Sequence, residues 1–344
     1  MAVFKTLTDA GGLTKQYLSA LGAGGWLKLA VVVLFLGGSG LTSQFPGLPV
    51  GPETAADPAE LWAAAGVIAA GLLIVGGFAY LAAVLEFVFV DSLRSRSLSL
   101  RLYVRSNLGT GLRLLLFRLG LWLAAVAVVA VPVAWTVLVG DVTAPAEVTP
   151  TQAVGIALTA VVALFGLTTA NTLTTLFVVP IMLHEQRGAL SGWRRFVDAA
   201  AATKLGVVAT VLLAWLIGFI LWAVLTVVGL IVSFVGIFGL ILTGSALGEL
   251  GSAYEPLIIG ALVAGLLGYQ YVVSLVVAPV RSYVRYYALV VLGDAEPQLD
   301  LIPTQREAIR SDGAVDNGRD AGDATDTAAS RKPAASSDGP DTEE

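Results

Sequence analysis

Long apolar runs separated by short charged segments dominate this sequence. A transmembrane helix needs about 20 apolar residues to cross a bilayer. Runs of that length cover residues 26–45, 61–90, 114–139, 152–183, 205–229 and 256–280. The pattern therefore predicts an all-α fold, a polytopic transmembrane helical bundle of about six spans.

The short segments between the apolar runs alternate in charge. Basic segments and acidic segments follow one another along the chain: 53–60 (acidic), 94–118 (basic), 141–147 (acidic), 187–204 (basic), 249–255 (acidic) and 281–285 (basic). Short basic loops stay in the cytoplasm. With six spans, all 20 Lys and Arg residues then lie on one side. We expect a multi-pass protein of the cell membrane with both termini in the cytoplasm.

Composition supports a membrane protein and indicates where the polar residues concentrate. Hydrophobic residues make up 56% of the chain and charged residues 13%, whereas soluble domains average about 25% charged residues. Cysteine is absent, which excludes disulfides and thiolate chemistry. We predict a cytoplasmic N-terminal segment at 1–25, a transmembrane helical domain at 26–292, and an acidic, mostly disordered cytoplasmic tail at 293–344, which has few apolar residues to bury.

The first apolar run allows two interpretations. Read as a span, it crosses the membrane at 26–45. Lys5, Lys15 and Lys28, the apolar stretch after them and the small residues at 37–40 also partly fit a cleaved signal peptide. The positively charged region is long for a signal peptide and no clean cleavage site follows, so we favour a retained span. The orientation of the later spans is the same in both cases.

The run at 205–247 has basic residues before it and acidic residues after it. Opposite flanks require an odd number of crossings, and three spans do not fit into this length. We therefore predict one span at 205–229 and then a Gly-rich half-helix or re-entrant segment at 230–248. Non-helical backbone at membrane depth must be covered by protein or line a wet cavity, because lipid offers it no hydrogen bonds.

Two cytoplasmic loops have the pattern of short interfacial helices. In the first loop Leu93, Leu100, Val104 and Leu108 share one helical face, and in the second Leu190, Trp193 and Val197 do so. Arginines beside these faces are candidate contacts to lipid headgroups: Arg94, Arg101, Arg105, Arg194 and Arg195. Topology anchoring by positive charge explains the same residues equally well.

One acid and one polar face lie inside the predicted spans. Glu86 is the acid, and an ionisable group at membrane depth is by default a functional candidate. It is also suited to a structural ion pair with a cytoplasmic base. Thr168, Asn171 and Thr175 share one face of the fourth span. That face can line a hydrated path, but helix packing through Thr and Asn accounts for it as well.

No complete catalytic or metal-binding motif is present. His184 and Glu185 resemble the start of a zinc-protease motif, but the second His that the motif needs is replaced by Gly188. Phosphate-binding loops, serine-hydrolase elbows and paired carboxylates are also incomplete. We therefore predict no catalytic residue, no metal, no cofactor and no enzyme activity.

Several short blocks resemble an uncharacterised family of haloarchaeal multi-pass membrane proteins. They are residues 85–94, 178–185, 192–196 and 285–294, and the similarity covers most of residues 1–305. The chain is more distantly similar to the membrane domain of some glycerophosphodiester phosphodiesterases. The soluble catalytic domain of those enzymes is absent here, so the resemblance implies a membrane domain without their activity.

Two classes of function remain open. The first is a non-enzymatic membrane protein that organises lipid or protein partners through its basic loops. The second is a transporter or channel component that uses Glu86 and the Thr168, Asn171 and Thr175 face. We favour the first because it requires fewer special residues. Membrane lipids are the expected partners, no nucleic acid is expected, and the sequence identifies no protein partner.

Overall fold

The computed structural model describes residues 2–36, 58–98, 100–140, 147–247 and 255–311. The chain divides into two compact units, Met1–Ile302 and Pro303–Glu344. In the second unit the described residues, 303–311, form a helix. All the long helices belong to the first unit, and no strand occurs among the described residues. The predicted acidic tail beyond residue 311 lies outside them.

The first unit is built from long helices joined by short connections. In chain order they are α1 (Ala2–Leu36), α2 (Pro58–Ser95), α3 (Leu100–Leu138), α4 (Pro150–Leu173), the π-helical turn η2 (Thr174–Val178), α5 (Val179–Glu185), α6 (Ala189–Ala202), α7 (Lys204–Leu247), α8 (Glu255–Ala295) and the 3₁₀ turn η5 (Pro297–Leu299).

Six of these helical segments are long and apolar enough to span a membrane. Within the described parts of the chain they are Lys5–Leu36, Ala64–Ser95, Val104–Leu138, Pro150–Glu185, Lys204–Gly239 and Gly260–Ala295. The predicted all-α fold with about six spans is confirmed. The predicted first span continued to residue 45, and its part beyond Leu36 lies outside the described residues.

The predicted half-helix or re-entrant segment at 230–248 is wrong. Instead α7 continues as one helix from Lys204 to Leu247, 44 residues in length. At about 1.5 Å per residue this helix extends about 66 Å, roughly twice the hydrocarbon core of a bilayer. One continuous helix agrees with the single crossing that the opposite flanking charges predict, and the chain does not fold back within residues 204–247.

The first predicted interfacial helix is also wrong, whereas the second loop does form a helix, whose position at the membrane interface stays a prediction. Between α2 and α3 the chain turns sharply at Arg96, which has a φ of 52°. Arg94 therefore belongs to the end of α2, and Arg105 belongs to α3. In contrast, α6 is a separate amphipathic helix. Its Phe196 is buried, while Leu190 and Val197 are exposed.

Side-chain burial divides the long helices into a packed part and an exposed part. In α2 the large exposed apolar side chains end at Phe78, and continuous burial begins at Ala83. In α8 the change falls between Val276, which is 60% exposed, and Val277, which is 8% exposed. Several helices expose apolar side chains over this length, and in a membrane protein lipid covers such a surface. The packed part lies at one end of each span.

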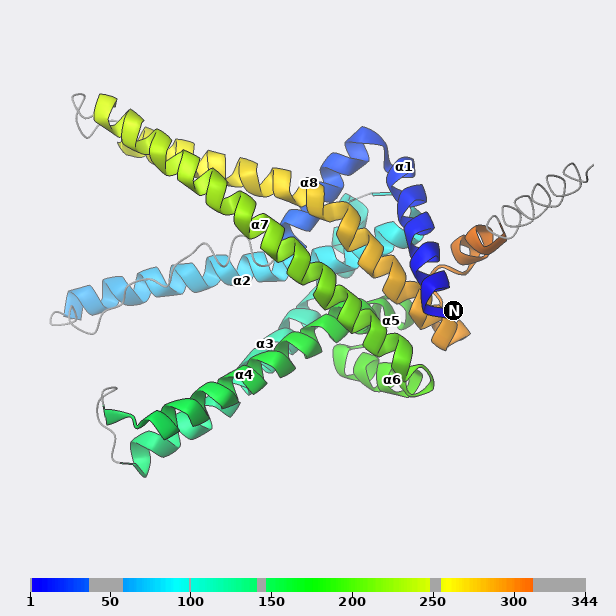
Figure 1. Ribbon diagram of the computed structural model, residues 1–344, viewed down its shortest axis with the longest axis horizontal. Coiled ribbons are helices and arrows are strands. Elements are labelled where there is room, and N and C mark those ends of the chain that lie inside the picture. The colour runs from blue at the N-terminus through cyan, green and yellow to red at the C-terminus, as the bar shows by residue number, and fades with distance from the viewer. Residues whose placement is uncertain (1, 37–57, 99, 141–146, 248–254, 312–344) are drawn as a thin grey trace, which may run out of the picture. The chain divides into compact units, whose positions relative to one another are not determined.

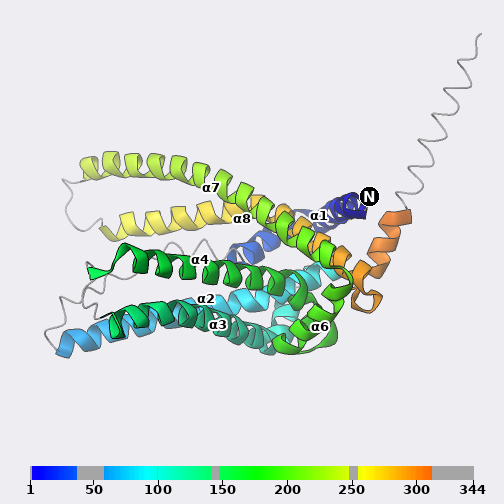
Figure 2. The same cartoon turned by 60° about the horizontal axis from the view of Figure 1, so that its bottom comes forward.

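The helices pair in their exposed parts and then diverge. In both views α7 lies along α8 (Figures 1 and 2), and in Figure 1 α3 lies along α4, with which it is in contact. The ends of these pairs that lie away from the N-terminus separate from each other and from the corresponding end of α2 (Figure 1). The packed part therefore holds the helices together.

The N-terminal helix closes the packed part. It breaks at Gly22, whose φ of 60° lies in the left-handed region that glycine adopts without strain. Before this break, α1 packs along α8, where the rings of Tyr17 and Tyr286 meet edge to face with centroids 6.0 Å apart. The Tyr17 hydroxyl lies 2.9 Å from the Ser92 hydroxyl on α2. The start of the chain thus links α2 and α8.

Close contact between α2 and α3 leads to a stability prediction. A Cβ atom added at Gly111 would overlap the side chain of Val84 and lie 3.0 Å from the Val84 Cα. We expect Gly111→Ala to lower the free energy of unfolding by about 1–3 kcal/mol, as overpacked cores do. Unfolding in mixed detergent micelles measures this difference.

Gly109→Ala is the matched control on the same helix. Nothing lies within 4 Å of a Cβ atom added at Gly109, so the better helix propensity of alanine should leave this variant at least as stable as the parent. Equal stability of the two variants would show that α2 and α3 do not pack closely at Gly111.

Candidate functional site

A π-helical turn in the fourth span leaves one backbone carbonyl of the site free to accept a hydrogen bond from another helix. The Val179 N–H bonds to the Thr174 carbonyl, five residues back. The residue five positions after Thr175 is Pro180, which has no N–H to donate. The Thr175 carbonyl is thereby left without a donor from its own helix. Single π turns of this kind often occur at functional sites.

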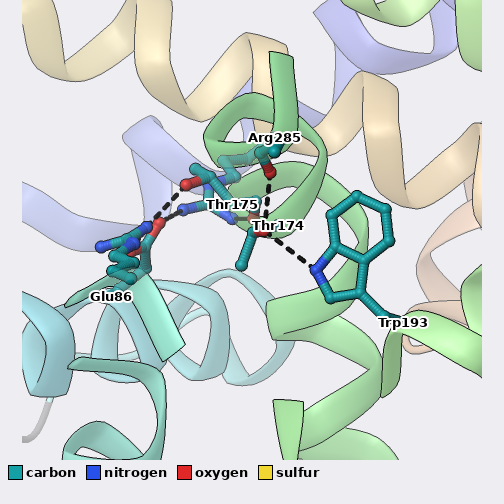
Figure 3. Close-up of polar contacts among 7 residues, drawn as sticks. Glu86, Thr174, Thr175, Trp193 and Arg285 are labelled. Carbon is teal, nitrogen blue, oxygen red and sulfur yellow. Dashed lines mark hydrogen bonds and ion pairs between the residues drawn. The ribbon is translucent and has the colours of Figure 1, made fainter. Parts of the chain in front are cut away.

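Arg285 of α8 supplies the missing donor. Its Nη1 donates to the Thr175 carbonyl, and its Nη2 donates to Glu86 Oε1 on α2 at 2.5 Å. Figure 3 shows Arg285 between Thr175 and Glu86. Only 6% of the Arg285 side chain is exposed. The guanidinium of Arg285 therefore joins three of the spans inside the protein.

A second arginine binds the other carboxylate oxygen. Arg118 Nη2 on α3 lies 2.6 Å from Glu86 Oε2 and donates to the Thr175 hydroxyl at 2.7 Å. Glu86 is thus held by a guanidinium on each of its two oxygens. A carboxylate withdrawn from water is tolerated when it is paired and hydrogen-bonded in this way.

A third arginine gives the site an excess of positive charge. Arg281, one turn before Arg285 on α8, is half-buried and lies within electrostatic range of Glu86 and Arg285. Among the described residues no carboxylate lies within ion-pair distance of Arg281. Three guanidinium groups face one carboxylate, so the cluster has a net charge of two positive units.

These groups lie at one end of a large cavity between the spans. The cavity has a volume of about 1870 Å³ and is lined by residues of α1, α2, α3, α4, η2, α7 and α8. Glu86, Arg118, Arg281 and Arg285 are the charged residues of the described lining. Most other wall residues are apolar, such as Leu225 and Leu266. The cavity is therefore amphiphilic, with one charged region and long apolar walls.

The polar residues singled out in the sequence lie in the wall of this cavity. Glu86, Thr168, Asn171 and Thr175 all line it. The Thr168 hydroxyl donates to the carbonyl of Leu164 in its own helix, as a packing role would require. The Asn171 carboxamide has no hydrogen-bond partner among the described residues. The structure thus brings Glu86 and the predicted polar face together in one site.

The arginines predicted to contact headgroups occupy different environments. Arg94, Arg105 and Arg194 are exposed, and the side chain of Arg101 lies outside the described residues. Arg195 is instead engaged within the protein, because it donates to Glu185 at 3.3 Å and also to Glu296. The hydrogen bond to Glu296 raises the pKa of Arg195 above its usual value. Arg195 ties α6 to the end of α8.

The amphipathic helix α6 supports the π turn from outside the cavity. Trp193 Nε1 donates to the Thr174 hydroxyl at 3.2 Å, as Figure 3 shows. The Trp193 ring also contacts Phe196, and Phe196 stacks on Phe177 of η2 with ring centroids 5.1 Å apart. The predicted interfacial residue Trp193 therefore faces the bundle and helps to fix the π turn.

The metal and acid-base candidates form no site. His184 Nε2 lies 3.0 Å from the Gln298 carbonyl, to which it donates a hydrogen bond. No group of three His, Asp or Glu residues able to hold a metal occurs in the described part of the chain.

Sequence reasoning identifies Glu86 but misses its partners. Arg118 and Arg285 belong to basic segments that topology alone explains, and Arg285 is 199 residues from Glu86. One signal was available: Arg118 lies within an apolar run, eighteen residues after the start of α3. An acid and a base inside two different spans would have suggested an interhelical pair.

The double ion pair predicts a large effect of Glu86→Gln on stability. The variant leaves Arg285 buried without its carboxylate, and removal of one partner of a buried ion pair lowers the free energy of unfolding by about 3–5 kcal/mol. The double variant Glu86→Gln/Arg285→Met should lose less than the sum of the two single variants. Denaturation in mixed micelles measures all three.

Asp198→Asn provides the control, because Asp198 is exposed on α6. Its effect should stay within about 0.5 kcal/mol. Strict additivity of Glu86→Gln and Arg285→Met would mean that the two side chains do not interact.

Comparison with known proteins identifies the family but no activity. No curated protein and no solved structure matches the chain. The model of a family of unknown function, DUF7544, matches residues 1–302, which include every long helix and the whole cavity site. The chain therefore belongs to the DUF7544 family of unknown function.

Proposed function

We propose that this protein is a non-enzymatic membrane protein that binds membrane lipid in the cavity between its spans. The observation that supports this function best is the cavity itself. Its volume of about 1870 Å³ exceeds the 300–1,000 Å³ or so of pockets for drug-sized ligands. Long apolar walls with charge at one end match the chemistry of a lipid, which has apolar chains and a polar head.

Access from the bilayer supports the same ligand. Several wall residues are also strongly exposed, among them Trp222 at 64% and Leu230 at 66%. These side chains belong to the part of the spans that lipid covers. A chain from the surrounding bilayer can therefore reach the walls without crossing the packed part.

Transport through Glu86 is the alternative function. The presence of Glu86, Thr168 and Asn171 in one cavity wall favours it. Proton transfer requires Glu86 to gain and lose a proton, whereas two guanidinium groups stabilise its ionised form. This pairing supports a structural role for Glu86 and a lipid ligand over a proton path. Enzyme activity is not part of the proposal.

We also propose that the packed ends of the spans and both termini face the cytoplasm of the cell. The basic segments of the sequence connect the helices at these ends, and the opposite ends of the helices lead into its acidic segments. The haloarchaeal source and the distant similarity to the membrane domain of glycerophosphodiester phosphodiesterases stay predictions from the sequence. Neither is needed for the lipid-binding proposal.

Filling the cavity tests the proposed function. Gly218 and Gly265 line the cavity, and nothing lies within 4 Å of a Cβ atom added at either position. We expect Gly218→Trp/Gly265→Trp to fold and to retain much less lipid after purification, because the indole rings would occupy the cavity. Native mass spectrometry counts the retained lipid molecules.

The matched control places the same rings outside the cavity. Gly166 and Gly268 lie on α4 and α8, have equally open surroundings, and do not line the cavity. Gly166→Trp/Gly268→Trp should retain as much lipid as the parent protein. Equal retention by all three proteins would assign the bound lipid to the outer surface and contradict the proposal.

Single cysteines test the proposed orientation, since the chain has none of its own. Glu147 and Arg194 are exposed at opposite ends of the spans. In intact cells we expect a membrane-impermeant thiol reagent to label Glu147→Cys and not Arg194→Cys. Labelling of Arg194→Cys before cell lysis would reverse the orientation.

A further inference from the structure

The charged end of the cavity has hydrogen-bond donors that the protein does not use. Arg281 has no ion-pair or hydrogen-bond partner among the described residues, although it lines the cavity. Arg118 directs its Nη2 to Glu86 and Thr175, and 24% of its side chain is exposed. Unmade hydrogen bonds of buried charged groups are unfavourable. A ligand with several acceptor oxygens would complete both guanidinium groups.

The charge of this region selects the ligand class. Three arginines face one glutamate, and no other charged residue occurs in the described lining. Two excess positive charges favour a ligand that carries net negative charge. Planar guanidinium groups match the oxygens of a phosphate in pairs of parallel hydrogen bonds. A phosphate oxyanion therefore fits the free donors in both charge and geometry.

A zwitterionic lipid fits this region less well. Its headgroup adds an ammonium group, which would need an acceptor beside the phosphate. Glu86 is the carboxylate of the described lining, and both its oxygens already accept from Arg118 and Arg285. An added ammonium would also lie close to three guanidinium groups. The site thus discriminates against a positive headgroup by repulsion as well as by lack of an acceptor.

The position of the cluster is that of a lipid phosphate. Glu86 and Arg285 lie just inside the packed part, beyond the points on α2 and α8 where exposed apolar surface ends. The apolar walls extend from there along the lipid-covered part of the spans, as far as Ile237 on α7 and Leu262 on α8. A headgroup at the arginines would therefore leave its chains against the apolar walls.

We propose that this region, through Arg281 and Arg118, binds the phosphate of an anionic phospholipid whose chains occupy the cavity. This inference rests on the proposed function, because it names the class of lipid that the cavity holds. Arg281 is the recognition residue, since its guanidinium is half-buried in the wall and makes no other ion pair with the described residues. Arg285 and Glu86 position Arg118 and keep the region rigid.

Competition between two lipids in nanodiscs tests the inference. Phosphatidylglycerol and phosphatidylcholine with identical chains are offered in equal amounts, and native mass spectrometry gives the ratio of the two lipids retained. We expect the parent protein to prefer phosphatidylglycerol. Arg281→Gln should reduce that preference about tenfold, the effect of losing a hydrogen bond between charged groups, while total lipid retention stays similar.

Two further variants show whether the lipid preference comes from the cavity, from the protein surface or from a loss of structure. Arg194→Gln removes an exposed arginine on α6 and should leave the preference unchanged. Arg281→Lys keeps the positive charge but loses the planar pair of donors, so it should retain part of the preference. Loss of preference with Arg194→Gln, or an unchanged preference with Arg281→Gln, would overturn the inference.

The outcomes also distinguish this inference from the proposed function. Lipid retention that the tryptophan variant abolishes, but without preference between the two headgroups, would refute the phosphate site and leave lipid binding intact. Absence of retained lipid in the parent protein would refute both. Stabilisation of the parent by inorganic phosphate alone, equal to that by phosphatidylglycerol, would assign the site to a free anion instead of a lipid.

Discussion

The pairing of Glu86 with Arg118 and Arg285 is the interaction on which the arrangement of the spans depends. Helices in a bilayer gain little from the hydrophobic effect when they associate, because lipid chains are as apolar as their side chains. Polar links and close packing must hold them together. Glu86, Arg118, Arg285 and Thr175 join α2, α3, α8 and the fourth span at one depth. Pro180 contributes by leaving the Thr175 carbonyl free for Arg285.

The same arrangement accounts for the cavity. Aromatic packing of α1 and α6 surrounds the charged cluster on the packed side, whereas the spans separate beyond it (Figure 2). Space between diverging helices in a membrane is filled by water, lipid or protein. Apolar walls favour lipid, and Arg281, which has no ion-pair partner among the described residues, favours a negative headgroup. Structural stability and ligand selection thus arise from one group of charges, of which Glu86 neutralises only a part.

The amino-acid sequence predicts the spans well, since apolar length alone determines them, and it identifies Glu86 because an acid within such a run is rare. It does not predict the partners of Glu86, because Arg285 lies in a basic segment that topology already explains. The expected re-entrant segment at 230–248 is wrong for a related reason. Flanking charges indicate whether the number of crossings is odd or even, but they do not limit the length of a helix, and α7 continues as one helix to Leu247. The π turn depends on tertiary contacts of Thr174 and Thr175 that no local pattern contains.

A structure determined by electron microscopy in nanodiscs of mixed anionic and zwitterionic lipid would test the central claim most directly. The account predicts elongated density in the cavity, with its head within hydrogen-bond distance of Arg281 and with Glu86 still bound to Arg118 and Arg285. A cavity that contains only water, or one filled by the side chains of the spans themselves, would contradict it.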